Sequence, residues 1–286
     1  MLFRKGQRAA ARILFVCLTV EPGIQTKGQK ETGMLCTSTP GESTGIRMNQ
    51  ILEELAGILY PRHCPLCHEV VRKRGELICP ACRKELDPIG EPRCKKCGKP
   101  VKTPEEEYCQ DCRERKHLYV RGMAALPYSG KIKESIYQMK FHNKREYIDF
   151  YGPYMAGVLG EAVMAWKADV LVPVPLHRSR LRKRGFNQAA LLAGHIGRAL
   201  AIPVRTDLVQ RIRATRPQKE LLYRERQNNL KGAFKISHYD VELKKIILVD
   251  DIYTTGSTVD EIAGELLKAG AEEVYFISLC IGRDDS

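Results

Sequence analysis

Eight of the eleven cysteines in this 286-residue chain form four Cys-x-x-Cys pairs. Eleven residues separate each pair from the next. The pairs are Cys64/Cys67, Cys79/Cys82, Cys94/Cys97 and Cys109/Cys112. Each pair presents two thiolates from one tight turn, and two pairs complete the tetrahedral four-thiolate site of structural zinc. The spacing therefore predicts two structural Zn2+ sites, each with four cysteine ligands.

The equal spacing leaves open which pairs share a metal. Consecutive pairing, first with second and third with fourth, is the simplest arrangement, but interleaved pairing fits the same gaps. A redox-active Cys-x-x-Cys fits any single pair but explains four pairs in register poorly. His63, His68 and His117 are further candidate ligands, which we interpret as surface residues or neighbours of the ligands because eight thiolates are already present. Metal-bound thiolates favour a reducing compartment, and we expect a cytoplasmic protein.

A second group of chemically useful residues lies in the segment Ile246–Thr258. An apolar run ends in two adjacent acids, Asp250 and Asp251, and a loop of small hydroxyl residues around Gly256 follows. Backbone N–H groups, hydroxyls and the positive end of a following helix suit one phosphate group. The carboxylates can accept hydrogen bonds from ribose hydroxyls, directly or through hydrated Mg2+. This pattern predicts a site for a phosphorylated sugar; the alternative is an ordinary strand–turn–helix junction with a capping threonine.

The same segment resembles the type I phosphoribosyltransferases, whose signature is an apolar strand, two acids and a phosphate loop of Thr, Gly and Ser residues. In this resemblance Asp250 and Asp251 match the ribose-binding acids. The residues that match the loop around the 5′-phosphate are Thr254, Thr255, Gly256, Ser257 and Thr258. The resemblance implies a site for phosphoribosyl pyrophosphate with Mg2+.

A further segment, Val172–Gln188, narrows the resemblance. It reads Val-Pro-Val-Pro-Leu-His-Arg-Ser-Arg-Leu-Arg-Lys-Arg-Gly-Phe-Asn-Gln. Together with the cysteine pairs upstream, it is similar to the ComF family of competence-associated proteins. The similarity extends over nearly everything from Met48 to Ile281, and residues 1–47 have no counterpart in it. It implies a role in handling incoming single-stranded DNA, with competence helicase or DNA-processing proteins as partners.

The resemblance also implies where the pyrophosphate lies. The loop after Pro175 would face it, with Leu176, His177 and Arg178 as candidate contacts. The basic cluster that ends at Arg184 would then enter a mobile loop.

The basic stretch 211–226 resembles a flexible lid in the same fold. We expect Arg184 and Arg216 to act in catalysis with Asp250 and Asp251, the arginines by stabilising the leaving pyrophosphate. The same basic surface can instead contact the phosphates of single-stranded DNA. The sequence does not divide these residues between the two roles.

Charge is concentrated in the second half of the chain. The net charge is +13, yet residues 167–235 hold 16 basic against 4 acidic residues, and residues 236–286 hold 4 against 11. A basic segment beside an acidic one is typical of a polyanion site that supplies its own metal-holding carboxylates. Residues 48–118, which contain the cysteine pairs, are close to neutral, with 14 against 12.

The elements that must position these residues follow an alternating pattern. We expect strands at 120–126, 169–175, 245–249 and 274–279, and helices at 132–140, 186–200 and 259–269. Such alternation predicts an α/β fold with a doubly wound, mainly parallel sheet and a site at the carboxyl ends of its strands. No apolar run is long enough to span a membrane.

Three domains are predicted. Residues 1–47 are a disordered extension or an incorrectly assigned start, residues 48–118 form a double zinc ribbon beginning with a helix at Met48, and residues 119–286 form the phosphoribosyltransferase-type domain.

Three functions remain open. The chain is a phosphoribosyltransferase with an unidentified nitrogen nucleophile, a protein of DNA handling that binds phosphoribosyl pyrophosphate, or a non-catalytic regulator on the same fold. The family resemblance favours the second. No segment stands out as a base-recognition element, and no glutaminase domain is recognised, so we do not expect glutamine-dependent amidotransfer.

Overall fold

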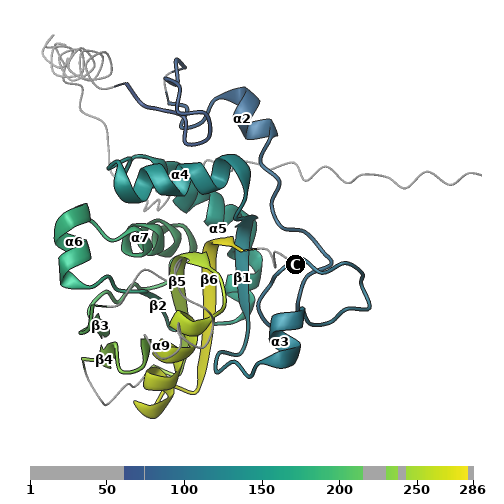
Figure 1. Ribbon diagram of the computed structural model, residues 1–286, viewed down its shortest axis with the longest axis vertical. Helices are drawn as coiled ribbons and strands as arrows, with labels where there is room; N and C mark the ends of the chain where they lie inside the picture. Colours follow the sequence, from purple (N-terminus) through teal and green to yellow (C-terminus); the bar gives the residue numbers. More distant parts are fainter. Residues whose placement is uncertain (1–60, 74, 215–229, 238–242, 283–286) are drawn as a thin grey trace, which may run out of the picture. The chain divides into compact units, whose positions relative to one another are not determined.

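The computed structural model describes residues 61–73, 75–214, 230–237 and 243–282 (Figure 1). These residues belong to one compact unit, Ile51–Ser286. The extension at 1–47 and the helix expected from Met48 lie outside the described residues. Among the described residues, no helix combines the length and hydrophobicity that crossing a membrane requires.

The centre of the unit is a parallel sheet, which has four strands within the described residues, in the order β1-β6-β5-β2. The strands are β1 (Gly122–Pro127), β2 (Val170–Pro173), β5 (Lys245–Tyr253) and β6 (Glu273–Ile281). Ile, Val, Leu and Phe dominate β2, β5 and β6, whereas β1 reads Gly-Met-Ala-Ala-Leu-Pro. Such apolar strands are usual where both faces of a parallel sheet are covered. The predicted α/β class and the four predicted strands are confirmed.

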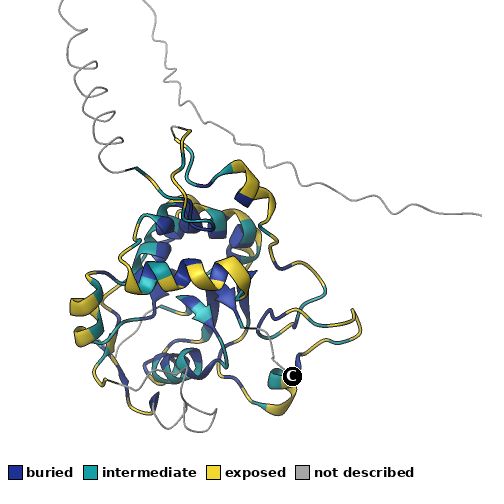
Figure 2. Ribbon diagram, turned by 45° about the horizontal axis from the view of Figure 1, so that its top comes forward, coloured by how far each residue is buried: buried dark blue, intermediate teal, exposed yellow. Residues whose placement is uncertain are grey.

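Successive apolar side chains of β5 enter different hydrophobic clusters. Ile247 and Val249 of β5 belong to one cluster, whereas Ile246 and Leu248 belong to the other. This follows from the two-residue period of a strand, which sends neighbours to opposite faces. Most residues of β5 and β6 are buried (Figure 2).

Helices cover both faces of the sheet. On the first face lie α4 (Gly130–Phe141), α5 (Tyr147–Ala165) and α7 (Gln188–Leu200), and on the second lie α9 (Ser257–Lys268) and the antiparallel pair β3 (Val209–Arg211) and β4 (Phe234–Ile236). The helices expected at 132–140, 186–200 and 259–269 are therefore confirmed as α4, α7 and α9. The 19-residue α5 and the β3–β4 pair were not predicted from the sequence.

The basic cluster after Pro175 is helical, which corrects the expectation of a mobile loop. Helix α6 (Arg178–Arg184) is capped by His177, whose imidazole accepts a hydrogen bond from the Ser179 backbone N–H. It ends at Gly185, which has a φ of 81°. Arg and Lys favour helices, and a glycine of this conformation is a common helix terminator.

The cysteine-rich segment forms two ribbons with short helices, α2 (Pro80–Lys84) and α3 (Gln110–Glu114). Apolar residues of the first ribbon, including Leu66 and Ile78, join the hydrophobic cluster under α4 and α5. Ile89 and the cysteines of the second ribbon join the cluster on the opposite face of the sheet. The two ribbons therefore share hydrophobic cores with the sheet rather than with each other.

Candidate functional site

The segment after β5 forms a tight loop at the start of α9. Gly256 is the N-cap residue of α9 and has a φ of 79°. The Thr255 and Ser257 hydroxyl oxygens are 3.0 Å apart, and Ser257 is buried in the first turn of the helix. Unpaired backbone N–H groups at a helix N-terminus attract anions. The predicted phosphate loop thus has the geometry of an anion-binding turn.

Gly256 is required in this turn for two reasons. Its positive φ is costly for residues with a Cβ, and a Cβ there would lie 2.6 Å from the Tyr253 hydroxyl and 3.0 Å from Cε1 of His117. We expect Gly256→Ala to lower the free energy of unfolding by about 2 kcal/mol, measured by urea denaturation. Gly157→Ala is the matched control, because a Cβ at that position of α5 meets nothing and should stabilise the helix. Equal stability of the two variants would contradict this account of the turn.

The two acids lie at the carboxyl end of β5 and differ in their partners. Asp251 pairs with Lys140 of α4, with 2.6 Å between Nζ and Oδ2, and accepts a hydrogen bond of 3.1 Å from the Gln188 amide of α7. Oδ1 of Asp250 accepts a hydrogen bond from the Asp251 backbone N–H at 2.8 Å. Asp251 is therefore held by side chains of two helices, α4 and α7, whereas Asp250 bonds only to the adjacent backbone in these contacts.

Their pKa values move in opposite directions. Desolvation raises the pKa of Asp250 well above its usual value, and the adjacent Asp251 carboxylate adds to the rise. Burial also acts on Asp251, but the charge and hydrogen bond of Lys140 hold the pKa of Asp251 below its usual range. Asp251 is thus ionised at neutral pH, whereas Asp250 is the acid whose charge a bound cation or hydroxyl donor would stabilise.

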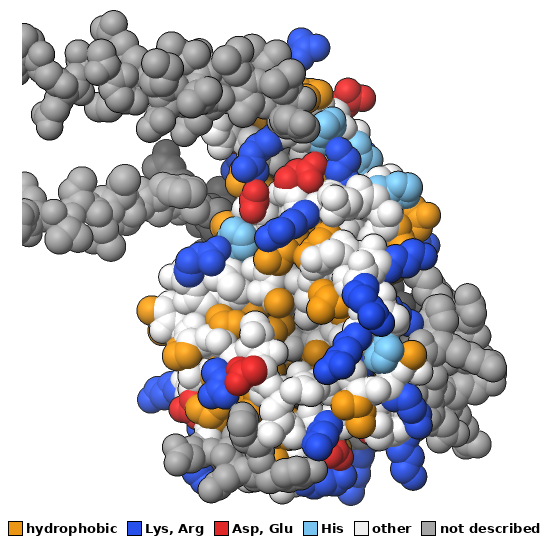
Figure 3. Space-filling view, turned by 90° about the vertical axis from the view of Figure 1, so that its left-hand side faces the viewer, with side chains coloured by type: hydrophobic (Ala, Val, Ile, Leu, Met, Phe, Trp, Pro, Cys, Tyr) orange, Lys and Arg blue, Asp and Glu red, His pale blue; other side chains and the backbone are white. Residues whose placement is uncertain are grey.

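Basic residues face the acids across a cavity of about 480 Å³. Arg180 and Arg184 of α6 are half-buried and line it, and Lys183 is exposed and also lines it. Burial lowers the pKa of Arg184, and desolvation together with Arg180 lowers the pKa of Arg211 to about 10. Lys and Arg side chains spread over this side of the molecule, with apolar groups between them (Figure 3).

Most predicted site residues line this cavity. Those that do are Leu176, Arg184, Asp250, Asp251, Thr254, Gly256, Ser257 and Thr258. His177 and Arg178 lie outside the lining, since His177 caps α6 and Arg178 is exposed on it. Thr255 also lies outside the lining and bonds to Ser257. Arg216 lies outside the described residues.

Lys140, Gln188, Arg180 and Arg211 line the same cavity and were not predicted as site residues. Lys140 and Gln188 lie more than 60 positions before Asp251 in the sequence, so no local spacing links them to the acids. Arg180 and Arg211 belong to the basic segments considered for pyrophosphate or DNA.

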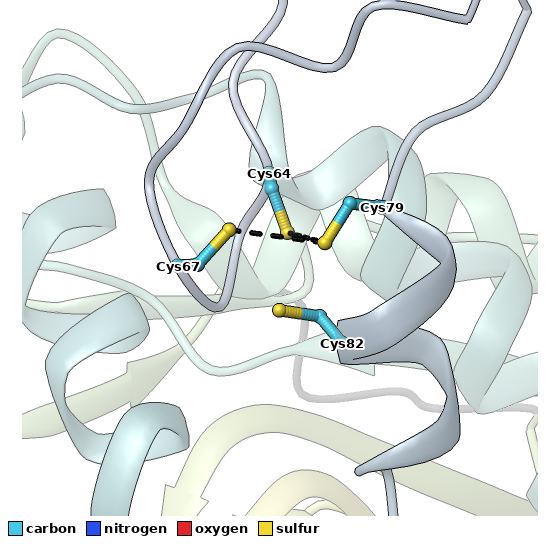
Figure 4. A group of neighbouring side chains, drawn as sticks. All are labelled: Cys64, Cys67, Cys79 and Cys82. Atoms are coloured by element: carbon cyan, nitrogen blue, oxygen red, sulfur yellow. Dashed lines mark hydrogen bonds between the residues drawn. The ribbon is translucent and has the colours of Figure 1, made fainter.

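The eight cysteines form two groups, which settles their pairing as consecutive: Cys64, Cys67, Cys79 and Cys82, then Cys94, Cys97, Cys109 and Cys112. The sulfur atoms of the first group point toward one another (Figure 4). Cys79 Sγ lies 3.8 Å from both Cys64 Sγ and Cys67 Sγ, and Cys97 Sγ lies 3.6 Å from Cys109 Sγ. A tetrahedral metal–sulfur distance of about 2.3 Å places sulfurs about 3.8 Å apart, so both groups fit zinc.

His117 joins the second ribbon to the loop around Gly256 at the start of α9. Its side chain is fully buried, with Nδ1 2.7 Å from Asp260 of α9, and it stacks on Tyr119 at 4.9 Å between ring centroids. The Tyr119 hydroxyl lies 2.7 Å from the hydroxyl of Tyr253. His117 is therefore not a surface residue, which was one of the two interpretations from the sequence, but part of the packing behind Gly256.

The two other candidate histidines, His63 and His68, make different contacts. Nδ1 of His68 is 2.8 Å from the Tyr147 hydroxyl, and Nδ1 of His63 is 3.3 Å from Nζ of Lys144. Neither belongs to a four-sulfur group. These contacts join the first ribbon to the segment around α5.

Comparison with known families defines the class. Residues 55–113 match the double zinc ribbon domain, and residues 187–285 match the phosphoribosyl transferase domain. The chain thus combines a double zinc ribbon with a phosphoribosyltransferase-type α/β domain.

Similar proteins with names show which family within this class the chain belongs to. The chain is 34% identical to the DNA utilization protein YhgH of Escherichia coli K12 over 59% of this chain and 75% of that protein. It is 41% identical to competence protein F of Haemophilus influenzae over 37% of this chain, although the match spans only 47% of that relative. Competence protein ComFC of Bacillus subtilis is 32% identical over half of this chain and 56% of its own length. The chain belongs to the ComF family of competence proteins.

Among solved structures, a purine phosphoribosyltransferase from Pyrococcus horikoshii aligns with 48% of this chain and 86% of its own, at 20% identity and a TM-score of 0.27. The fold assignment rests on the domain match and on the parallel sheet described above.

Proposed function

We propose that the chain binds phosphoribosyl pyrophosphate with Mg2+ and acts in the handling of single-stranded DNA that enters the cell during natural transformation. The observation that carries the ligand is the convergence of the acid pair, the phosphate loop and two arginines on one cavity of about 480 Å³. The DNA role is supported by the family and by relatives named for competence and DNA utilization.

Each part of the ligand has a chemical counterpart in the cavity. The N-terminal turn of α9 suits the 5′-phosphate, because backbone N–H groups and the Ser257 hydroxyl converge there. Asp250 and Asp251 suit the ribose hydroxyls. Arg180 and Arg184 suit the pyrophosphate, since guanidinium groups bind phosphate oxygens in pairs.

Mg2+ would be held by the acid pair, directly or through water, and would supply positive charge to the pyrophosphate oxygens. A ligand that brings this charge offsets the cost of ionising Asp250. Transfer of the phosphoribosyl group to a nitrogen nucleophile would need an acceptor, and release of pyrophosphate from mixtures of candidate acceptors would reveal it. Binding without turnover would instead leave a regulator on the same fold.

The test is calorimetric titration of the zinc-loaded, full-length protein with phosphoribosyl pyrophosphate and Mg2+. We expect saturable binding that is lost in the double variant Asp250→Asn/Asp251→Asn and kept in Asp207→Asn, which alters an exposed acid outside the cavity lining. Repeating the titration with single-stranded DNA measures coupling between the two ligands. Absence of binding by the wild-type protein would refute the ligand, and salt-independent or absent DNA binding would refute the DNA role.

A further inference from the structure

Two exposed aromatic rings line the mouth of the cavity. Tyr137 and Phe141, one turn apart on α4, are 43% and 58% exposed and belong to the cavity lining. Their ring centroids are 5.0 Å apart with an interplanar angle of 41°. Aromatic rings that stabilise a fold are usually buried, so an exposed pair beside the cavity indicates a binding site for a ligand.

A cation already lies against this pair. The guanidinium of Arg184 lies 5.8 Å from the centroid of the Phe141 ring. The ring of His142 also stands 5.4 Å from that of Tyr137. The aromatic pair and the basic helix α6 therefore border the same opening, although they come from different parts of the chain.

The basic residues of α6 fall into two groups, which differ in burial and in whether they line the cavity. Arg180 and Arg184 are half-buried and line the cavity, whereas Arg178 and Arg182 are exposed and do not. Lys183 is exposed and also lines the cavity. One side of the helix can thus serve a ligand inside the cavity while the other offers charge to a polyanion outside it.

We infer that Tyr137 and Phe141 form a stacking platform for an unpaired nucleobase, and that the phosphates of the same single strand lie along the exposed cations Arg178 and Arg182. Aromatic side chains on which bases stack, beside basic residues that follow the backbone, are the usual means of holding single strands without reading their sequence. A single nucleic-acid strand is favoured over a free base because only the strand carries phosphates that the exposed cations of α6 can bind. This inference rests on the proposed function for its DNA and adds the place where a base is held.

The test measures fluorescence anisotropy of the zinc-loaded, full-length protein with three probes: oligothymidylate, an abasic strand of equal length, and free thymidine as competitor. We expect tighter binding of oligothymidylate than of the abasic strand. Tyr137→Ala and Phe141→Ala should each weaken oligothymidylate binding by about 5- to 100-fold. Both should leave the abasic strand unaffected.

Two controls separate stacking from general damage. Tyr137→Phe keeps the ring and should restore the affinity for oligothymidylate. Tyr108→Ala removes a ring of similar exposure, 42%, from the second ribbon and should have no effect. Because Tyr108 does not line the cavity, its variant reports any non-specific loss of surface aromatics.

The outcomes are distinct. Full affinity of both alanine variants for oligothymidylate, or equal binding of the base-bearing and abasic strands, overturns the platform even if phosphoribosyl pyrophosphate binds. Weakened thymidine binding with unchanged strand binding overturns the single-strand assignment and identifies a free base as the ligand. Loss of strand affinity in a protein that fails to bind phosphoribosyl pyrophosphate supports the platform and refutes the proposed ligand. Failure to bind any of the three probes overturns the inference.

Discussion

Replacing Asp250 by asparagine is expected to stabilise the protein, whereas the same change at the adjacent Asp251 destabilises it. We expect Asp250→Asn to raise the free energy of unfolding at pH 7 by about 1 kcal/mol. Asp251→Asn should lower it by about 3 kcal/mol. On the proposed function, each variant also loses about 10- to 100-fold in affinity for phosphoribosyl pyrophosphate, because a charge-assisted hydrogen bond is removed.

The opposite signs follow from the partners of the two acids. Asp250 has a raised pKa because its charge is desolvated and lies beside a second carboxylate. An asparagine keeps an oxygen for the Asp251 backbone N–H and removes that charge. Asp251 instead neutralises Lys140, whose side chain is only 19% exposed, so its loss leaves a cation with little water around it.

The difference depends on pH in a defined direction. The pKa of Asp250 is raised in the folded state, so ionisation of this group destabilises the fold. This destabilisation is absent below the unfolded pKa of about 3.9 and grows as the pH rises above it. Since the folded pKa of Asp251 is lowered, its contribution is present above about 3.9 and is lost as the pH falls through the folded value.

Urea denaturation from pH 4 to pH 8 measures both effects. The advantage of Asp250→Asn over wild type should shrink toward pH 4, and Asp207→Asn should track wild type throughout because its carboxylate is exposed. Equal destabilisation by both cavity variants at pH 7 would show that the acid pair is not under electrostatic strain.

Loss of one cysteine ligand is expected to remove one of the two zinc ions and to loosen only the face of the sheet on which that ribbon packs. Structural zinc supplies about 10 kcal/mol of binding free energy in small zinc domains, so a ribbon without its metal should unfold locally. For Cys82→Ser we expect faster hydrogen exchange in the segments packed around α5. For Cys97→Ser we expect it in β1 and in the loop at Gly256, behind which His117 packs.

Zinc stoichiometry by mass spectrometry and hydrogen exchange of the same samples check this prediction. Cys280→Ser is the matched control, because Cys280 is fully buried in β6 yet lies outside both four-sulfur groups. It should retain both zinc ions whatever its effect on stability. Uniform loosening of the whole sheet in both ribbon variants would contradict the separation into two faces.

The sequence predicts those parts of the site whose residues are close in the chain. The cysteine ligands and the segment from Asp250 to Thr258 carry their chemistry in short spacings, and their local conformations follow from turns, strand ends and helix starts. The partners of the acids could not be predicted in this way. Lys140 of α4 reaches Asp251 of β5 only in the folded chain, and an isolated lysine at a helix end carries no signal of that contact.

Two errors have a common physical cause. The basic stretch from Arg178 to Arg184 was expected to enter a mobile loop because the family resemblance implied one, yet its residues are good helix formers between a capping histidine and a glycine. His117 was interpreted as a surface residue or a neighbour of the metal ligands because eight thiolates were already present, whereas its side chain is buried and its partner Asp260 is 143 positions away. Local composition does not report the packing that brings distant segments together.

The position of β6 has a consequence for how the protein folds during synthesis. This strand follows the other three in the sequence, yet it lies between β1 and β5 and is the strand with which β1 pairs in this sheet. The ribosome adds roughly 5–20 residues per second, so β1 and the ribbons emerge before the segments on which they pack have been synthesised. Each ribbon can bind zinc at that stage, because its cysteines are close in the sequence. The sheet cannot form until β6 has been synthesised, so folding is completed late and through non-local contacts.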